Sequence, residues 1–450
     1  SSANGVTLQY DKEGRLTQCP QNGKAFSATY DNGGRLATVS YHDSALTVTY
    51  TYDSRNRLTG VSDSEGTTLA MTYDNAGRLT SLTRTPGIDS TFTYDGAGRL
   101  KGIQEGTIIN LDYTLNAASE VTEVDFTAPV TPSVTPGSQL LKFGKAGEIV
   151  TPGHTYDIRG RLTSSPGRTY GWDGASRLTN ANGVMLTYNG FGDVETRVES
   201  GQTSLFYHHY ALGMAPIVYE DTPSGSDRAY VWTPDGHLLY NVDIATGDPI
   251  FYHFDRMGST LALTDKNETV TDSYAYGPYG EPLSPPAAST QPFTYIGKYG
   301  VRKEGALYQM RARYYDPQTA RFLSRDPLPP RLDDPKSLNL YEYAAENPMK
   351  FLDPSGEDHA TARPFRDFNR YEPTRFGQLP LCEFFLGAFG LADSPNKIES
   401  PAEKENKKVF VRGQANMALE AWKRRAASGP GAASGASVSG PLGSGHSGAG

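Results

Sequence analysis

The stretch from Tyr73 to Thr80, which reads Tyr-Asp-Asn-Ala-Gly-Arg-Leu-Thr, decides the fold that we predict for this chain. The residues just before Asp74 favour a short strand, and Arg78 begins a returning strand. Asp74 can accept hydrogen bonds from the backbone amides of the turn. Gly77 stands where such a turn needs a positive φ. We therefore interpret the stretch as a β-hairpin.

The same pattern recurs along the chain. Five close copies place a tyrosine at intervals of 20 to 22 residues, at Tyr10, Tyr30, Tyr52, Tyr73 and Tyr94. Degenerate copies occur later at Tyr156-Asp157, Trp172-Asp173, Tyr188-Asn189, Tyr230 and Tyr252. One hairpin cannot bury its own apolar face, so we expect stacked copies to form a continuous sheet.

Three features qualify this pattern. Asn56 replaces the turn glycine in its copy and tolerates a positive φ, whereas Ser176 is a poorer substitute, so we expect a distorted turn there. Prolines interrupt the pattern between Thr127 and Gly153. Because proline cannot donate to a central ladder, we expect a loop or edge excursion that decorates the fold rather than dividing it.

The composition is typical of short strands and tight turns. The 450 residues include 48 Gly, 30 Pro and 28 Tyr, and the net charge of -8 gives no reason to expect a nucleic-acid partner. Two cysteines, Cys19 and Cys382, cannot form a disulfide framework. His208 and His209 would point to opposite faces of one strand. We therefore interpret them as structural and expect no metal site and no cofactor.

The repeated Tyr-Asp-x-x-Gly-Arg-Leu pattern resembles the YD repeat, or RHS repeat, of bacterial Rhs proteins, of the C component of Tc toxin complexes and of animal teneurins. The resemblance covers about residues 5–356. It includes the later elements that start at Tyr252 and Tyr276. It implies an all-β protein whose YD-repeat hairpins wind as a spiral sheet into a hollow shell, or cage. An ordinary sandwich or propeller is the alternative.

This resemblance divides the chain into four expected parts. Residues 1–307 would form the repeat shell, and residues 308–356, which look like the RHS-associated core, would close it. Residues 357–425 would be a variable segment, mostly irregular or α-helical. Residues 426–450 are rich in Gly and Ser, which indicates disorder. The chain has no initiating Met or signal peptide and looks like the C-terminal part of a longer protein.

The core resemblance also implies a self-cutting site. In Rhs proteins and Tc toxin C components this segment is similar to an aspartic protease acting on its own chain. The family's arginine falls on Arg313 and its aspartates fall on Asp326 and Asp353. Two neighbouring carboxyls share a proton, so one can activate water while the other donates to the scissile carbonyl. An arginine can keep one of them ionised and oriented. Any enzyme activity would be a single-turnover self-cleavage at most.

Two observations leave cleavage open. Asp-Pro is a common turn starter, which is the interpretation that we favour for Asp316 and Asp334 and the alternative for Asp326 and Asp353. The family reads Asp-Pro-x-Gly-Leu with the cut after Leu, whereas Glu357 stands at the Leu position here. A charged side chain fits poorly in a pocket made for leucine.

The tail contains no convincing catalytic motif. Its longest apolar run, Leu379–Ala392, includes Glu383 and is too short for a stable membrane span. Val409–Arg425 has helical character and ends in basic residues, which suits a helix C-terminus. A partner-binding, shell-plugging or degenerate role is the simplest interpretation of this tail, and a short pore-forming or membrane-active payload through Leu379–Ala392 is the alternative.

We therefore carry three hypotheses for function. In the first, the chain is part of an exported bacterial shell that encloses and delivers its own C-terminal polypeptide, released by Asp326 and Asp353 near Glu357. In the second, it is an uncut cell-surface protein that binds a partner or glycan. In the third, activity resides in residues 357–425. A secretion-system or immunity protein would be the external partner, and the protein would be secreted or surface-bound.

Overall fold

The computed structural model describes residues 2–3, 5–130, 132, 140–283, 291–330, 335–357 and 360–361. The expectations for the tail, including Leu379–Ala392 and Val409–Arg425, therefore lie outside the described residues. Within the described ranges the chain consists of antiparallel strands with a few short 3-10 helices. The predicted all-β fold is confirmed.

The first half of the chain forms a twelve-stranded sheet in which each strand pairs with its neighbour in sequence. Its strands are β3 (Gln9–Tyr10), β4 (Leu16–Gln18), β5 (Ser27–Tyr30), β6 (Leu36–Tyr41), β7 (Leu46–Tyr52), β8 (Leu58–Asp63), β9 (Thr68–Tyr73), β10 (Leu79–Thr85), β11 (Ser90–Tyr94), β12 (Leu100–Glu105), β13 (Ile109–Leu115) and β14 (Val121–Thr127). Ahead of it, β1 (Ser2–Ala3) pairs with β2 (Val6–Thr7).

A thirteen-stranded sheet comes next, with the same sequential pairing. It consists of β15 (Thr155–Tyr156), β16 (Leu162–Ser165), β17 (Arg168–Trp172), β18 (Leu178–Ala181), β19 (Val184–Tyr188), β20 (Val194–Glu199), β21 (Gln202–His208), β22 (Ile217–Asp221), β23 (Arg228–Trp232), β24 (Leu238–Asp243), β25 (Pro249–Phe254), β26 (Thr260–Thr264) and β27 (Val270–Ser273). The proline-interrupted segment lies between the two sheets. It connects β14 to β15 outside both ladders, as expected for a proline-rich loop, and one hydrophobic core contains residues of both sheets.

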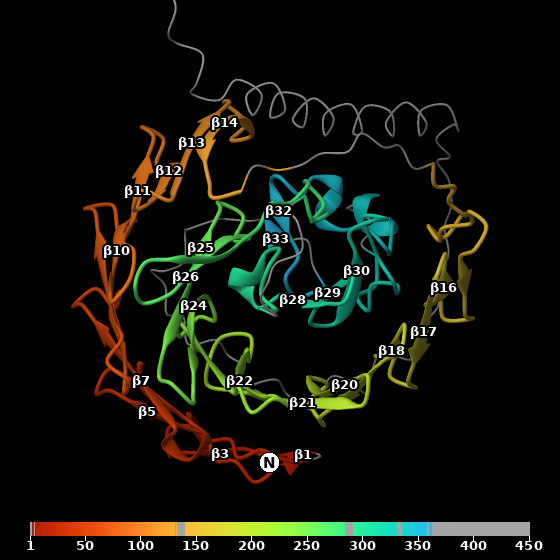
Figure 1. The fold of residues 1–450 in the computed structure, drawn as a ribbon. Coiled ribbons are helices and arrows are strands. Elements are labelled where there is room, and N and C mark those ends of the chain that lie inside the picture. The colour runs from red at the N-terminus through yellow and green to blue at the C-terminus, as the bar shows by residue number, and fades with distance from the viewer. Residues whose placement is uncertain are drawn as a thin grey trace, which may run out of the picture.

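The two sheets wind as a spiral (Figure 1). The first sheet forms an outer arc, and β22 to β26 of the second sheet turn inward and lie along the inner side of that arc. The last described segments occupy the centre. They comprise β28 (Arg302–Glu304), β29 (Leu307–Met310), β30 (Arg313–Asp316), β31 (Arg321–Phe322), β32 (Phe351–Leu352) and β33 (Ala360–Thr361). The spiral sheet that the family resemblance implied is thus confirmed, and the last described segments lie inside it.

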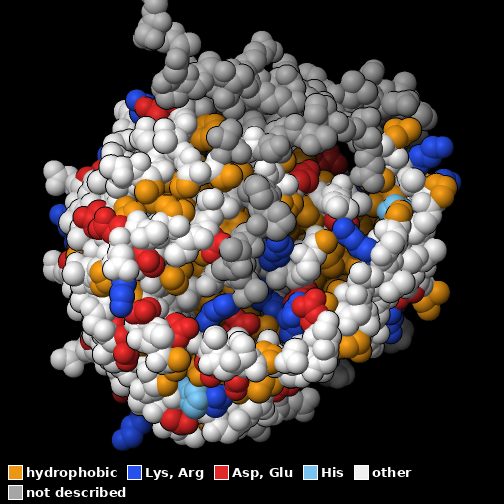
Figure 2. Space-filling view, viewed as in Figure 1, with side chains coloured by type: hydrophobic (Ala, Val, Ile, Leu, Met, Phe, Trp, Pro, Cys, Tyr) orange, Lys and Arg blue, Asp and Glu red, His pale blue; other side chains and the backbone are white. Residues whose placement is uncertain are grey.

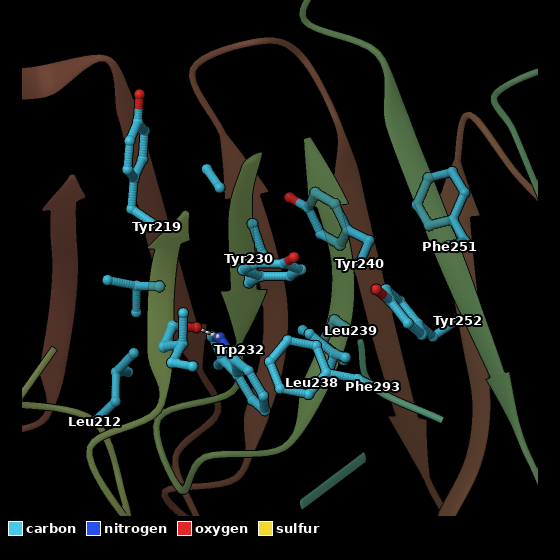
Figure 3. Packing of buried hydrophobic residues seen from close by; sticks show 14 of the residues in the cluster. Leu212, Tyr219, Tyr230, Trp232, Leu238, Leu239, Tyr240, Phe251, Tyr252 and Phe293 are labelled. Carbon is cyan, nitrogen blue, oxygen red and sulfur yellow. Dashed lines mark hydrogen bonds between the residues drawn. The ribbon is translucent and has the colours of Figure 1, made fainter. Parts of the chain in front are cut away.

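The two turns of the spiral differ in burial. In the outer strand β7, Leu46, Val48 and Tyr50 point inward and alternate with more exposed residues. This alternation is typical of an antiparallel sheet with one face in water. The inner strands β23 and β24 are buried along nearly their whole length. One face of them packs on the outer sheet and the other on the central segment, where Phe293 meets Tyr230 and Trp232 edge-on (Figure 3).

Polar side chains connect the two turns. The Tyr50 hydroxyl donates to the Trp232 carbonyl at 2.8 Å, and the Tyr240 hydroxyl donates to Asp63 Oδ2 at 2.8 Å. A buried polar group is costly without a partner. These bonds therefore fix how the inner sheet sits on the outer one.

The hairpin turn has the predicted chemistry. Asp74 Oδ1 accepts the Arg78 amide at 2.9 Å, and Asp74 Oδ2 accepts Arg78 Nε at 2.6 Å. Gly77 has a φ of 81°. These hydrogen bonds lower the pKa of Asp74. The Ser176 turn is not distorted, contrary to our expectation. Ser176 takes the same positive φ, and the ion pair between Asp173 and Arg177 is retained, so the side-chain clamp outweighs the local strain.

Each turn is also attached to the next repeat. The Arg78 guanidinium lies 4.5 Å from the centre of the Tyr94 ring, and the Tyr94 hydroxyl donates to the Leu79 carbonyl at 2.8 Å. The cation–ring contact recurs for Arg15 with Tyr30, Arg35 with Tyr52, Arg57 with Tyr73, Arg161 with Trp172 and Arg177 with Tyr188. At Trp172 the indole Nε1 replaces the phenol as the donor, to the Leu162 carbonyl.

The histidine pair has a structural role, as predicted. His208 places its ring nitrogens 2.9 Å and 3.0 Å from the carbonyl oxygens of Ala215 and Val194. His209 Nε2 lies 3.1 Å from the Ser27 carbonyl oxygen, which belongs to the other sheet. Burial lowers the pKa of His209 to about 4.

The attachment between repeats can be tested at Tyr94. Tyr94→Phe keeps the ring under Arg78 but removes the hydrogen bond to Leu79, so we expect the free energy of unfolding to fall by about 1 kcal/mol. Urea titration monitored by fluorescence measures this. Tyr10→Phe is the control, because Tyr10 is 47% exposed and its hydroxyl has no hydrogen-bond partner among the described residues. An equal loss in both variants would contradict the argument.

Candidate functional site

The candidate site is organised by Arg313, the first residue of β30, whose side chain is only 2% exposed. Its Nη2 lies 2.9 Å from Asp326 Oδ2 and 3.2 Å from Asp353 Oδ2. Its Nε donates to the carbonyl oxygen of Gly356. The structure therefore brings the three predicted residues together around one guanidinium nitrogen, next to the backbone that leads into Glu357.

Asp353 begins a tight turn that holds this backbone in place. Its Oδ1 accepts the Gly356 amide at 2.8 Å, the Ser355 hydroxyl at 3.0 Å and the Glu357 amide at 3.2 Å. Gly356 has a φ of 69°, and a Cβ there would lie 2.2 Å from the Met310 carbonyl oxygen. The glycine of the Asp-Pro-Ser-Gly motif is therefore required by space as well as by backbone conformation.

Asp326 reaches the site from the loop after β31. Its amide donates to the Leu340 carbonyl at 2.8 Å, and its Oδ1 accepts the Leu328 amide at 2.8 Å. Its side chain is 22% exposed, whereas that of Asp353 is 3% exposed. Asp326 is thus the carboxylate of the pair that water can reach.

Phe322 and Leu340 are two further site residues that the sequence analysis did not identify. The Phe322 ring centre lies 3.7 Å from Arg313 Cζ, and the Leu340 carbonyl accepts from Arg313 Nη1 at 3.2 Å. An aromatic face is a favourable surface for a guanidinium. The aromatic residue in Arg321-Phe322-Leu323 is visible in the sequence. Only the fold shows that this ring, Phe322, contacts the guanidinium of Arg313.

The site contains more acidic than basic side chains. Burial lowers the pKa of Arg313, and the neighbouring Asp326 and Asp353 oppose that shift. Burial also raises the pKa of Glu357, and repulsion from Asp326 and Asp353 adds to the effect. Asp326, Asp353 and Glu357 thus compete for one guanidinium. Protonation of any one of these three carboxyl groups therefore relieves the repulsion among them.

The other predicted Asp-Pro pairs are not part of this site. Asp316 Oδ1 accepts the Gln318 amide at 2.9 Å, as expected for a turn, and Asp316 Oδ2 lies 3.5 Å from Arg168. Asp334 lies outside the described residues. No cluster of three metal-ligating side chains occurs in the described ranges. Among the same residues, no helix is long and apolar enough to cross a membrane.

A family model described as the teneurin YD-shell matches residues 2–90 and 89–349. The match covers most of the chain, so the chain belongs to the YD-shell family. The resemblance inferred from the repeats is therefore confirmed.

Named relatives match shorter stretches. The tRNA3(Ser)-specific nuclease WapA of Bacillus spizizenii is 29% identical over 214 residues, which are 45% of this chain and 9% of the relative. The toxin protein Tse5 of Pseudomonas aeruginosa is 33% identical over 112 residues, which are 24% of this chain and 8% of the relative. The chain thus spans less than a tenth of the length of either relative. A solved Tc holotoxin pore of Photorhabdus luminescens aligns with 79% of this chain and 20% of its own, at 19% identity and a TM-score of 0.39.

The charge imbalance predicts a pH-dependent effect of Glu357→Gln. The pKa of Glu357 is raised in the folded state, so its ionised form destabilises the fold above that pKa, and the penalty disappears below the unfolded pKa of about 4.3. Glu357→Gln should therefore raise the melting temperature relative to the parent at pH 7, with little difference at pH 4. Glu268→Gln, in an exposed hairpin turn, is the control. An equal shift at both pH values would contradict the assignment.

Proposed function

We propose that this chain is part of a secreted YD-shell that encloses a C-terminal polypeptide and releases it by cutting itself next to Glu357. The observation that carries this proposal is the convergence of Asp326 and Asp353 on Arg313 beside the Gly356 carbonyl. Two carboxyls and a cation at a tight turn are the groups that acid–base hydrolysis of a peptide bond requires.

The surroundings of the two carboxyls suggest a division of roles. Asp353 accepts three hydrogen bonds and an arginine contact, which favours its ionised form. It would hold the turn and orient the chain. Asp326 is the more exposed of the two, so it would exchange protons with water and activate the attacking water molecule. Arg313 Nε donates to the Gly356 carbonyl and would fix the backbone that leads to the cut.

The position of the site supports release of the segment on its C-terminal side. The described chain passes through the centre of the spiral before it reaches Glu357 (Figure 1). Figure 2 shows the recessed middle of this face, where charged and apolar side chains are both visible between the walls. The payload would be residues 357–425. The names of the relatives, a nuclease and a toxin, support a harmful payload, and an immunity protein would then be its natural partner.

A second candidate is an uncut shell. The same contacts close the turn from Asp353 to Gly356 without any chemistry, and Glu357 stands where the family has Leu. In that case Arg313 would be a structural clasp, and the protein would act through binding at its surface.

Intact-mass measurement of the purified chain separates the two candidates. We expect two fragments that meet next to Glu357 in the parent, and one uncut mass in Asp326→Asn and in Asp353→Asn. Asp316→Asn, which alters an Asp-Pro turn outside the site, should still cut. Glu357→Leu should cut faster, because the side chain then matches the family and one negative charge is removed.

An uncut parent together with an uncut Glu357→Leu variant would contradict the proposal. The surface-binding candidate would then be preferred. A cut that persists in both Asn variants would assign the cleavage to a contaminating protease.

A further inference from the structure

Among the described residues, three histidines are buried, and all three lie where the second sheet faces the first. They are His208, His209 and His253, which are 5%, 0% and 0% exposed. The proposed cleavage site uses none of them. His208 differs from the other two, because both of its ring nitrogens face carbonyl oxygens and a charged ring can donate to both. The other two rings are placed to be neutral.

His209 follows β21 and contacts the first sheet. Its Nε2 lies 3.1 Å from the carbonyl oxygen of Ser27 in β5, so this nitrogen carries the hydrogen of the neutral ring. Its Nδ1 accepts the amide of Ala211 at 3.3 Å. An amide N–H cannot accept a hydrogen bond, so a proton added to Nδ1 would face another hydrogen. The neutral ring therefore satisfies both partners, whereas the charged ring satisfies only Ser27.

The surroundings of His209 do not compensate a positive charge. The rings of Phe26 and Tyr41 lie 6.5 Å and 6.2 Å from it, measured between ring centres. No charged side chain in the described part of the chain contacts it, and the Ser27 carbonyl only partly offsets the burial that lowers its pKa. The titratable side chains next to this contact, Tyr41 and Cys19, have pKa values that burial raises, so both remain neutral in acid.

His253 of β25 makes the second contact, through a buried network of charges. Its Nδ1 lies 2.9 Å from Glu105 Oε2 at the end of β12, and its Nε2 lies 2.8 Å from Thr264 Oγ1. Arg84 Nη1 of β10 lies 3.3 Å from the same carboxylate oxygen. One positive and one negative charge therefore balance while His253 is neutral. A proton on His253 would add a second buried positive charge, which is costly away from water.

Lys298 also faces this network. Burial lowers its pKa to about 8, and the charges of Asp235, Glu105 and Asp255 oppose that shift. Lys298 is therefore charged at pH 7 and adds to the repulsion that a protonated His253 would meet. Asp255 acts in the opposite sense, because burial raises its pKa to about 6 and its ionisation at neutral pH destabilises the fold. The effect of the histidines must therefore be measured as a difference between the parent and histidine variants.

We propose that His209 and His253 form an acid-sensitive contact, which holds the second sheet against the first and loosens when these rings take up protons. The stabilisation is complete above about pH 6.5, the ordinary pKa of histidine, and is lost as the pH falls toward the lower pKa of the folded state. The hydrogen bond from Tyr50 to the Trp232 carbonyl does not titrate in this range, so the sheets stay attached there. The shell thus opens partly in acidic surroundings, whether or not the chain is cut.

Cys19 reports on this contact. It is 0% exposed, and its amide donates at 2.9 Å to the carbonyl of Phe26, the residue before Ser27. In a Cys382→Ser chain, the rate at which Cys19 reacts with a dipyridyl disulfide is divided by the rate of the same chain unfolded in urea at the same pH. This division removes the pH dependence of the thiol itself. The ratio then measures how often the contact opens.

We expect this ratio to rise between pH 7 and pH 5 in the parent. The folded pKa of His209 is about 4, and that of an exposed histidine is about 6.5, so His209 alone should increase the ratio about 20-fold. Circular dichroism at pH 5 should retain the sheet signal, because only one contact is loosened.

Neutral amides replace the two rings without their titration. His209→Gln retains a donor for the Ser27 carbonyl, and His253→Asn retains a donor for Glu105. Each variant should reduce the rise in the ratio, and the double variant should show little change between pH 7 and pH 5. If one single variant does not fold, the other still tests the proposal. His154→Gln, in the segment between the two sheets, is the control and should leave the rise unchanged.

The proposal fails on any of three results. The first is a ratio that is the same at pH 7 and pH 5 in the parent. The second is an equal rise in the parent and in the double variant. The third is loss of the sheet signal at pH 5, since acid would then unfold the shell rather than loosen one contact. The ratio is measured in the Asp326→Asn chain as well, so failure here is distinguishable from failure of self-cleavage.

Discussion

The fold depends on one repeated contact, in which an aspartate clamps the arginine of its own turn beneath the tyrosine of the next repeat. The aspartate fixes the turn and the direction of the guanidinium. The guanidinium then presents a flat cation to the aromatic ring, whose hydroxyl bonds back to the preceding strand. Each exposed pair contributes little alone. Repetition couples successive hairpins of the close repeats, so the sheet gains stability as a chain of nearest-neighbour contacts.

The interior is built from the strand faces that this contact leaves free. The clamps and rings occupy the turns, so the strand faces remain available for packing. The outer sheet gives one face to water and one to the inner sheet, and the inner sheet buries both of its faces. The hydroxyls of Tyr50 and Tyr240 form hydrogen bonds between the outer and inner sheets, which fixes the position of one sheet on the other. The central segment is held by its contact with the inner sheet. Arg313, Asp326 and Asp353 therefore converge although they lie far apart in sequence.

Much of the fold could be predicted from the amino-acid sequence alone. The tyrosine spacing, the aspartate acceptors and the turn glycines predict the hairpins and the all-β class, because these are local properties. The convergence on Arg313 was expected from resemblance, since no local rule places Asp326 near Asp353. The undistorted turn at Ser176 could not be predicted from propensity, because the clamp from Asp173 to Arg177 outweighs it. The nesting of one sheet inside the other is a long-range property, visible in the sequence only as the apolar run from Ala229 to Trp232.

The repeat pattern and the family motif each fail at one place in the chain. At Asp255 the clamping arginine is replaced by Ser259, and there the wall has an apolar cavity whose charged lining residues are Glu123, Asp255 and Arg256. At Glu357 the family's apolar residue is replaced by an acid, and there the carboxyl groups compete for one guanidinium.

The central claim is that the chain encloses its own C-terminal segment, and protease protection tests it most directly. Trypsin should leave Lys404 to Arg425 uncut while the shell stays folded, and should digest this stretch once the shell is unfolded with urea. Mass spectrometry over a time course reports both. Rapid trimming of these sites from a chain whose shell remains intact would show that the tail lies outside and would contradict the account.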